Sequence, residues 1–288
     1  MSGRKVQGSG SGSASGVGTA GILRSVAVPV VLLAVWEGCS RAGWVNPMIL
    51  PSPSAVFLKW IAYLKPFKPY DPAAGGYLAW LVSGELLHDA AASLYRVILG
   101  FLIGAGLALP LGLLMGTSRT VYALVNPLLQ VLRPIPPIAY IPLAILWFGL
   151  GNPPAFFLIS LGAFFPVVMN TISGVRTVDA IYIRAAQNLG APKTTLFWRV
   201  ILPAATPHIM TGIRVGFGVA FIVVIVAEMI AVNDGLGYRI LEAREFFWSD
   251  KIIAGMVTIG LLGLAIDTGL QRFSDHLLRW HRGIESSR

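Results

Sequence analysis

The chain has 288 residues, of which 55% are hydrophobic and only 12% are charged, whereas a soluble domain carries about 25% charged residues. This balance excludes an ordinary soluble protein, and the long apolar runs are typical of a chain that lipid surrounds. The net charge of +9 comes without a basic patch interleaved with stacking aromatics, which argues against nucleic-acid binding. The single cysteine, Cys39, excludes an internal disulfide and a tetrahedral cysteine metal site.

The N-terminal region predicts a polar tail followed by one membrane helix. Residues 8–18 are rich in Gly and Ser, so we expect residues 1–20 to form a disordered cytoplasmic tail. An apolar run at 22–39 then predicts the first transmembrane helix. Its resemblance to a lipoprotein signal is weak, because Trp36 and Glu37 stand where cleavage needs small residues. We assign residues 21–92 to this helix and a periplasmic segment.

Five further runs are long enough to cross a ~30 Å hydrocarbon core, which takes about 20 helical residues. The sequence therefore predicts an all-α membrane protein with about six transmembrane helices. Gly100 and Gly104 have the spacing that allows close helix contact. Prolines inside several runs predict kinks, which membrane helices tolerate where neighbours satisfy the freed backbone groups. The five runs are 93–115, 121–150, 155–175, 211–232 and 252–270.

Charge asymmetry predicts the orientation. With the N-terminus in the cytoplasm, the inner segments hold twelve Lys/Arg and three acids, whereas the outer segments hold eight Lys/Arg and seven acids. The positive-inside bias therefore predicts that both termini are cytoplasmic. We assign residues 93–275 to the membrane core and residues 276–288 to a cytoplasmic C-terminal tail.

Two outer segments, 53–64 and 238–250, mix polar and aromatic residues and predict helices that lie at the membrane interface. Packing on the membrane surface and a docking rim for an external partner both explain them.

The inner segment 176–208 predicts a pair of short helices. Thr177 or Asp179 can cap the first helix, which would carry Ile181, Ala185 and Leu189 on one face. Gly190 suits the left-handed residue that ends a helix, which gives it a positive φ. Pro192 suits the first turn of a second helix, and Pro203 should stop the apolar stretch that follows.

This segment resembles the coupling motif of bacterial importer permeases, E-A-A-x3-G-x9-I-x-L-P. In that family it docks into the ATPase subunit, which the resemblance implies for this chain too. Arg184 stands where the motif has glutamate, so the role of that acid does not carry over. Ala185, Ala186, Gly190, Leu202 and Pro203 match the motif, and with Arg184 they are the residues that the resemblance assigns to ATPase coupling.

The resemblance runs from about residue 36 to residue 281 and narrows to the taurine and aliphatic-sulfonate branch, with nitrate and bicarbonate permeases as more distant relatives. It rests on short motifs in order: Leu50-Pro51-Ser52-Pro53, Arg133-Pro134-Ile135-Pro136-Pro137, Leu146-Trp147-Phe148-Gly149, Ala227-Glu228, Ala243-Arg244-Glu245-Phe246 and Arg279-Trp280-His281.

The resemblance implies a multi-pass permease of the bacterial inner membrane that needs other chains. Its partners would be ATPase subunits, which bind ATP and Mg, a periplasmic or extracellular substrate-binding protein, and a second permease copy. The sequence lacks any Gly-Lys dipeptide, so it lacks the phosphate loop of such ATPases. We expect no cofactor, metal or catalytic residue in this chain.

Polar residues within membrane spans are candidates for the translocation pathway. Arg133 precedes a proline cluster that interrupts the helix and could attract an anion, or it could anchor a helix end. Tyr140 and Asn170 could hydrogen-bond substrate or pack between helices. Glu228 would repel an anion, which favours a structural role with a partner such as Arg214 or a residue of the second subunit. Asp267 could pair with Arg272 or Arg214.

Three other classes fit less well. An intramembrane enzyme would need a catalytic constellation, which the four histidines do not form. An ion channel would need a selectivity filter or a ring of acids. A stand-alone secondary transporter would be expected to show an inverted repeat.

Overall fold

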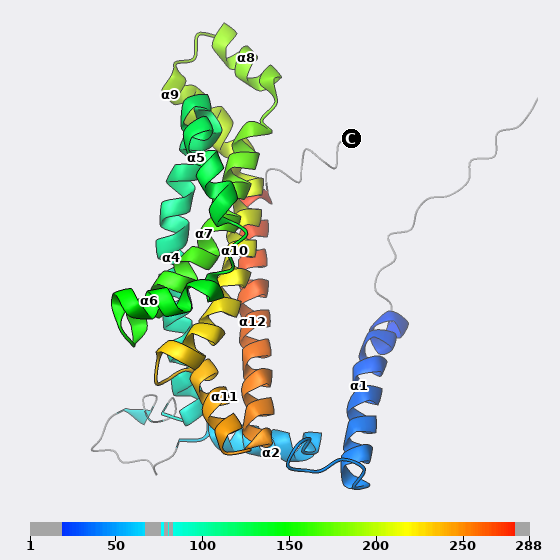
Figure 1. Ribbon diagram of the computed structural model, residues 1–288. Coiled ribbons are helices and arrows are strands. Elements are labelled where there is room, and N and C mark those ends of the chain that lie inside the picture. The colour runs from blue at the N-terminus through cyan, green and yellow to red at the C-terminus, as the bar shows by residue number, and fades with distance from the viewer. Residues whose placement is uncertain (1–18, 67–75, 78–79, 81–82, 280–288) are drawn as a thin grey trace, which may run out of the picture.

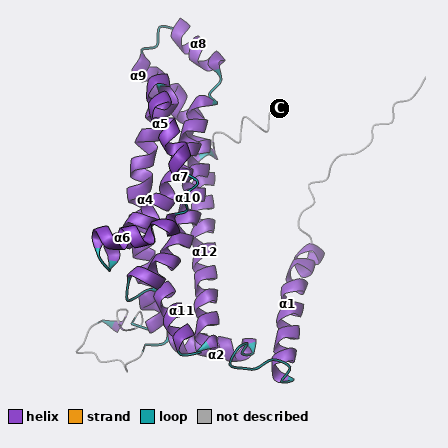
Figure 2. Ribbon diagram, in the orientation of Figure 1, coloured by secondary structure: helices purple, strands orange, loops and turns teal. Residues whose placement is uncertain are grey.

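The computed structural model describes residues 19–66, 76, 77, 80 and 83–279, and nearly all of them lie in helices or turns (Figures 1 and 2). The tail predicted for residues 1–20 therefore lies almost wholly outside the described residues, as do residues 280–288. The helices are α1 (Thr19–Arg41), α2 (Pro53–Leu64), α4 (Glu85–Thr117), α5 (Arg119–Leu132), η1 (Pro137–Tyr140), α6 (Ile141–Phe148), α7 (Asn152–Arg176), α8 (Ala180–Asn188), α9 (Lys193–Leu196), η2 (Phe197–Ile201), α10 (Leu202–Ala231), α11 (Leu236–Glu245) and α12 (Ser249–Leu277).

The core consists of α4, α7 and α10, whose inward faces carry small residues. A Cβ built on Gly100 would lie 2.6 Å from the Cγ2 of Ile159, and one on Gly112 would lie 2.7 Å from the Cβ of Thr171. Gly104 faces the backbone of Ser160 in the same way. The prediction of close contact at Gly100 and Gly104 is therefore confirmed, and α4 packs backbone to backbone against α7.

The predicted single span 121–150 is wrong in detail, because the chain bends by 83° between α5 and the η1–α6 segment. The break follows Arg133 and contains Pro134, Pro136 and Pro137. Each proline removes a backbone donor and disfavours helical geometry in the residue before it, so the helix cannot continue.

Four helices in the described chain are long and apolar enough to cross a membrane, and the bent pair makes a fifth if it is counted as one span. These correspond to five of the six predicted runs. The first predicted run lies in α1, which is not among the spans counted by length and composition. Figure 1 shows α1 apart from the bundle, and it is tied to α2 where Glu37 Oε1 accepts a 2.7 Å hydrogen bond from Ser54 Oγ.

The two ends of the bundle differ. α8 and α9 lie at one end, with the C-terminal end of α12, whereas α2 and α11 lie at the other (Figure 1). α2 has the bounds predicted for the first interfacial helix, and Trp60 Nε1 donates a 2.8 Å hydrogen bond to Thr258 on α12. The second predicted helix, 238–250, is displaced, because α11 spans Leu236–Glu245 and α12 begins at Ser249.

The helix that contains the predicted run 93–115 is longer than that run. α4 starts at Glu85, eight residues before the apolar run at 93. Its first turns carry the charged residues Glu85 and Asp89, which hydropathy assigns to a loop. Each of them forms an ion pair with another helix.

Candidate functional site

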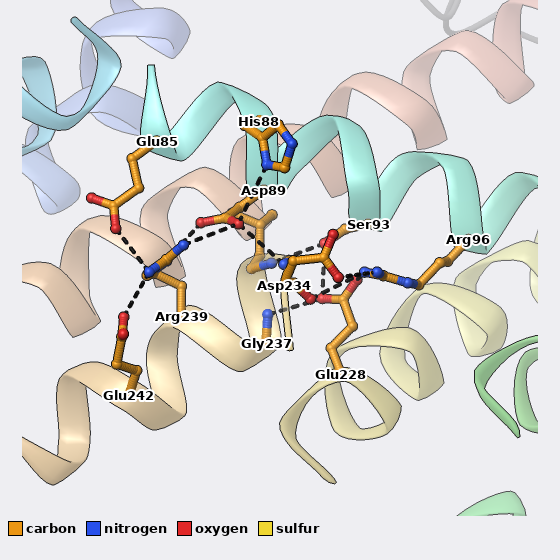
Figure 3. A network of polar contacts seen from close by, with 12 residues as sticks. Glu85, His88, Asp89, Ser93, Arg96, Glu228, Asp234, Gly237, Arg239 and Glu242 are labelled. Atoms are coloured by element: carbon orange, nitrogen blue, oxygen red, sulfur yellow. Dashed lines mark hydrogen bonds and ion pairs between the residues drawn. The ribbon is translucent and has the colours of Figure 1, made fainter. Parts of the chain in front are cut away.

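A buried polar network ties α4 to α10 near the end that carries α11 (Figure 3). The side chain of Glu228, on α10, is fully buried, and Arg96, on α4, is 3% exposed. Glu228 accepts hydrogen bonds from Arg96 Nη1 at 2.9 Å, from Ser93 Oγ at 2.8 Å and from the Gly237 backbone N–H at 3.0 Å. An acid with three donors and a cation in contact is stable in an apolar interior, where an isolated charge would be very costly.

Arg96 also reaches two other parts of the chain. Its Nε donates to Asn152 Oδ1 at 2.7 Å, at the first residue of α7, and its Nη2 pairs with the Asp234 carboxylate. One guanidinium therefore connects α4, α7, α10 and the loop before α11.

A second cluster lies beside the first, around Arg239 of α11. Its Nε donates to the fully buried Asp89 of α4 at 2.8 Å, and its Nη1 lies 2.9 Å from Glu85 and 2.7 Å from Glu242. Burial of the guanidinium opposes its charge, but the hydrogen bonds with Asp89 and Glu242 outweigh this and raise the pKa of Arg239 above its ordinary value. The arginine stays charged and holds α11 against α4.

This network was not predicted from the sequence. A structural role was favoured for Glu228, which the burial supports, but the suggested partner Arg214 was wrong. Arg214 instead binds Asp267, which was one of two pairings predicted for that acid. A signal was present, since Arg96 lies inside the run 93–115 and a charge inside a span calls for a partner.

The predicted pathway residues fall into two groups. Arg133 and Asn170 line one open cavity of about 310 Å³. Of the described residues that line it, Arg133 alone carries a charge, and within the described part of the chain Arg133 forms no ion pair. Asn170 Nδ2 donates to the Pro166 carbonyl at 2.8 Å. The remaining lining residues are Ile135, Pro137, Leu161, Gly162, Phe165, Pro166, Met169, Val215 and Val219.

Tyr140 and Glu228 do not line this cavity. Tyr140 ends the 3₁₀ turn η1 and packs, partly buried, against the hydrophobic core. Glu228 belongs to the buried network described above.

The first helix of the predicted pair is α8, and its ends are as expected. Of the two predicted caps, Asp179 is the one that forms, since its Oδ1 accepts a 2.8 Å hydrogen bond from the Ile181 N–H. Gly190 has φ +76°, as predicted, and a Cβ there would meet no atom within 4 Å. Ile181 is exposed and Leu189 is 88% exposed. Both apolar side chains therefore lie outside the hydrophobic core of the described chain.

The second helix of the pair differs from the prediction. Residues Lys193–Ala231 form one continuous helical run of 39 residues, so Pro203 does not stop the apolar stretch. The π turn η2 (Phe197–Ile201) precedes this proline. Its wider turn lets the helix pass a residue that lacks a backbone donor.

Comparisons with known proteins agree with this architecture. Residues 108–282 match the family model of the binding-protein-dependent transport system inner membrane component. A putative ABC transporter permease protein of Methanocaldococcus jannaschii is 40% identical, with 92% of this chain and 95% of that protein covered. The taurine transport system permease protein of Escherichia coli is 35% identical, covering 91% and 90%. A putative aliphatic sulfonates transport permease protein of Bacillus subtilis is 37% identical, covering 92% and 90%.

A chain of the MetNI methionine ABC transporter, solved in an inward-facing conformation, has a TM-score of 0.56 at 19% identity, covering 69% of this chain and 96% of its own. This likeness concerns the fold. Together with the matched family model and the relatives of similar length, it shows that the chain belongs to the inner membrane permease components of binding-protein-dependent ABC transporters.

Proposed function

We propose that this permease imports taurine or another aliphatic sulfonate, driven by ATPase subunits that other chains supply. The relatives named for taurine and for aliphatic sulfonates are similar to this chain over about nine tenths of its length. The observation that carries the proposal is the cavity at the α5–η1 break, where Arg133 contributes positive charge without an acid beside it. The other lining residues are mostly apolar, so the field of the exposed Arg133 guanidinium acts on an anion that enters the cavity.

The four predicted pathway residues have distinct roles in this proposal. Arg133 contacts the sulfonate, and Asn170 offers a polar side chain from α7. Tyr140 fixes the turn that keeps the cavity open. Glu228 acts from outside the cavity, by holding α10 against α4.

Coupling to ATP hydrolysis is assigned to the α8–α9 pair. Arg184, Ala185, Ala186 and Gly190 would lie in a groove of the ATPase subunit, which binds ATP and Mg. Leu202 and Pro203 are the first residues of α10, which would transmit movement of the docked pair into the membrane. The exposed apolar residues of α8 support this assignment, since a docked partner would cover them.

The remaining partners follow from the same arrangement. With the α8–α9 end in the cytoplasm, both termini are cytoplasmic and α2 and α11 face the periplasm, where the binding protein docks. One chain with one coupling pair implies two permease copies over two ATPases. We place this assembly in the bacterial inner membrane.

Transport in reconstituted vesicles tests the proposal. The chain is assembled with the ATPase and binding protein encoded beside it, and ATP-dependent uptake of labelled taurine is measured with ethanesulfonate, nitrate and bicarbonate as competitors. We expect ethanesulfonate to compete best. Preference for nitrate or bicarbonate would support that alternative instead, and uptake without the ATPase would indicate a secondary transporter.

Two variants locate the pathway. Arg133→Gln should lower the uptake rate at least about tenfold, the scale of one lost hydrogen bond to a charged group. Arg119→Gln, at the other end of α5, is the matched control and should transport normally. Equal transport by both variants would remove Arg133 from the pathway.

A further inference from the structure

An exposed ion pair lies within the membrane-spanning helices α10 and α12. Arg214 donates to Asp267 through Nε and Nη2, both at 2.7 Å, and Nη2 also lies 3.4 Å from Gln271 Oε1. The two charged side chains are 44% and 50% exposed. By contrast, the ion pair of Arg96 and Glu228, which joins α4 to α10, is buried.

Such a pair is not expected to face lipid, because ionised side chains inside a bilayer line water-filled cavities or protein contacts. The pair opens onto a cavity of about 500 Å³. Val215 belongs to the lining of this cavity and to that of the Arg133 cavity, so the two adjoin along α10. The lining consists of Met210, Thr211, Arg214, Val215, Asp267, Gln271, Ser274 and Asp275.

We propose that Arg214 is a second contact for the transported sulfonate, on the inner side of Arg133, and that Asp267 is the competing anion that releases it. This inference rests on the proposed function. The sulfonate would replace the Asp267 carboxylate as the acceptor for the two Arg214 donors, Nε and Nη2. When it leaves toward the cytoplasm, Asp267 takes the donors back.

The two cavities carry different net charges, and the difference favours release of an anion toward the Arg214 cavity. The Arg133 cavity has one cation and no acid among its described lining residues, so it attracts an anion. The Arg214 cavity has one cation and two acids, Asp267 and Asp275, so it retains an anion poorly. A conducting site must bind strongly enough to admit the ion and weakly enough to let it go.

Labelling of introduced cysteines tests whether this cavity holds water. In a Cys39→Ser background, Gln271→Cys faces the cavity, and Phe273→Cys is a matched control two residues away. Since about 200° of helix separates them, the control lies on the opposite face of α12. An anionic methanethiosulfonate reagent should modify Gln271→Cys in the assembled transporter and leave Phe273→Cys unmodified. Equal labelling of the two, or labelling of the control alone, would overturn the proposal.

Inhibition from the product side tests the exchange itself. In vesicles whose ATPase subunits face the bath, binding protein and labelled taurine are enclosed, and ethanesulfonate in the bath inhibits ATP-driven export. Asp267→Asn frees Arg214, so the half-inhibitory concentration should fall about tenfold, the effect of uncovering a charged hydrogen-bonding group. Asp267→Glu should restore the wild-type value, and Arg214→Gln should make export insensitive to bath sulfonate.

A structural role gives a different result. If the pair only holds α10 to α12, Asp267→Asn changes the export rate and leaves the half-inhibitory concentration at the wild-type value, which would refute this inference alone. Failure of the wild-type assembly to carry taurine or ethanesulfonate would instead refute the proposed function.

Discussion

Removal of Glu228 should destabilise the chain more than the loss of any exposed ion pair. In Glu228→Ala, three donors lose their acceptor: Arg96 Nη1, Ser93 Oγ and the Gly237 N–H. Breaking a buried ion pair by deleting one partner costs about 3–5 kcal/mol. Arg96 retains Asp234 and Asn152, so we expect the lower part of this range, about 3 kcal/mol.

The assay is thermal unfolding of the purified chain in detergent. For a chain of this size, 1 kcal/mol corresponds to about 2–4 °C in Tm, so Glu228→Ala should lower Tm by roughly 10 °C. The Tm of Glu228→Gln should lie between those of the wild type and Glu228→Ala, since the glutamine amide still accepts hydrogen bonds but lacks the charge.

Asp267→Asn is the matched control, because it removes an acid from a pair whose side chains are about half exposed. Exposed pairs contribute about 0–1 kcal/mol, so its Tm should change little. If Glu228→Ala unfolds at the wild-type temperature, the network does not support the fold and the reasoning from burial fails.

The remaining predictions concern coupling, orientation and energy supply. Gly190→Val forces a β-branched residue to φ +76°, which costs at least about 1–2 kcal/mol, so this variant should insert in the membrane but co-purify with little ATPase. Ala186→Asp should do the same, and normal assembly and uptake by both would show that α8–α9 is only a loop. In a Cys39→Ser background, Lys193→Cys should resist an impermeant reagent applied to intact cells, and its modification would contradict the topology. The purified chain alone should hydrolyse no ATP, and robust hydrolysis would contradict its dependence on partner ATPases.

Local features of the fold could be predicted from the sequence, because neighbouring residues determine them. The segment 53–64 was predicted as a helix from its mixture of polar and aromatic residues. In the structure, Ser52 Oγ accepts a hydrogen bond from the Ala55 N–H at the start of α2, where Pro53 suits the first turn. The Asp179 cap and the positive φ of Gly190 have the same origin. Both ends of α8 could therefore be predicted from the residues within and beside that helix.

Long-range pairings could not be predicted in this way. Arg96 and Glu228 are 132 residues apart, and hydropathy gives no information about which charges meet. The bend after Arg133 was foreseen as an interruption, but its angle depends on how η1 and α6 pack against α7. The sequence does not predict the π turn before Pro203. Pro110, Pro127, Pro166 and Pro207 also lie inside helices, so a proline in an apolar run does not by itself predict a helix end.

The helical run from Lys193 to Ala231 joins α9, the second helix of the coupling pair, directly to the fifth predicted span. Its 39 residues extend about 58 Å at 1.5 Å per residue. If the ATPase tilts it by about 5° around its midpoint, each end moves by about 2.5 Å, in opposite directions. Because Glu228 binds Arg96 and the Gly237 N–H near the far end of the run, that displacement would reach α4 and α11, at the end of the bundle opposite α8.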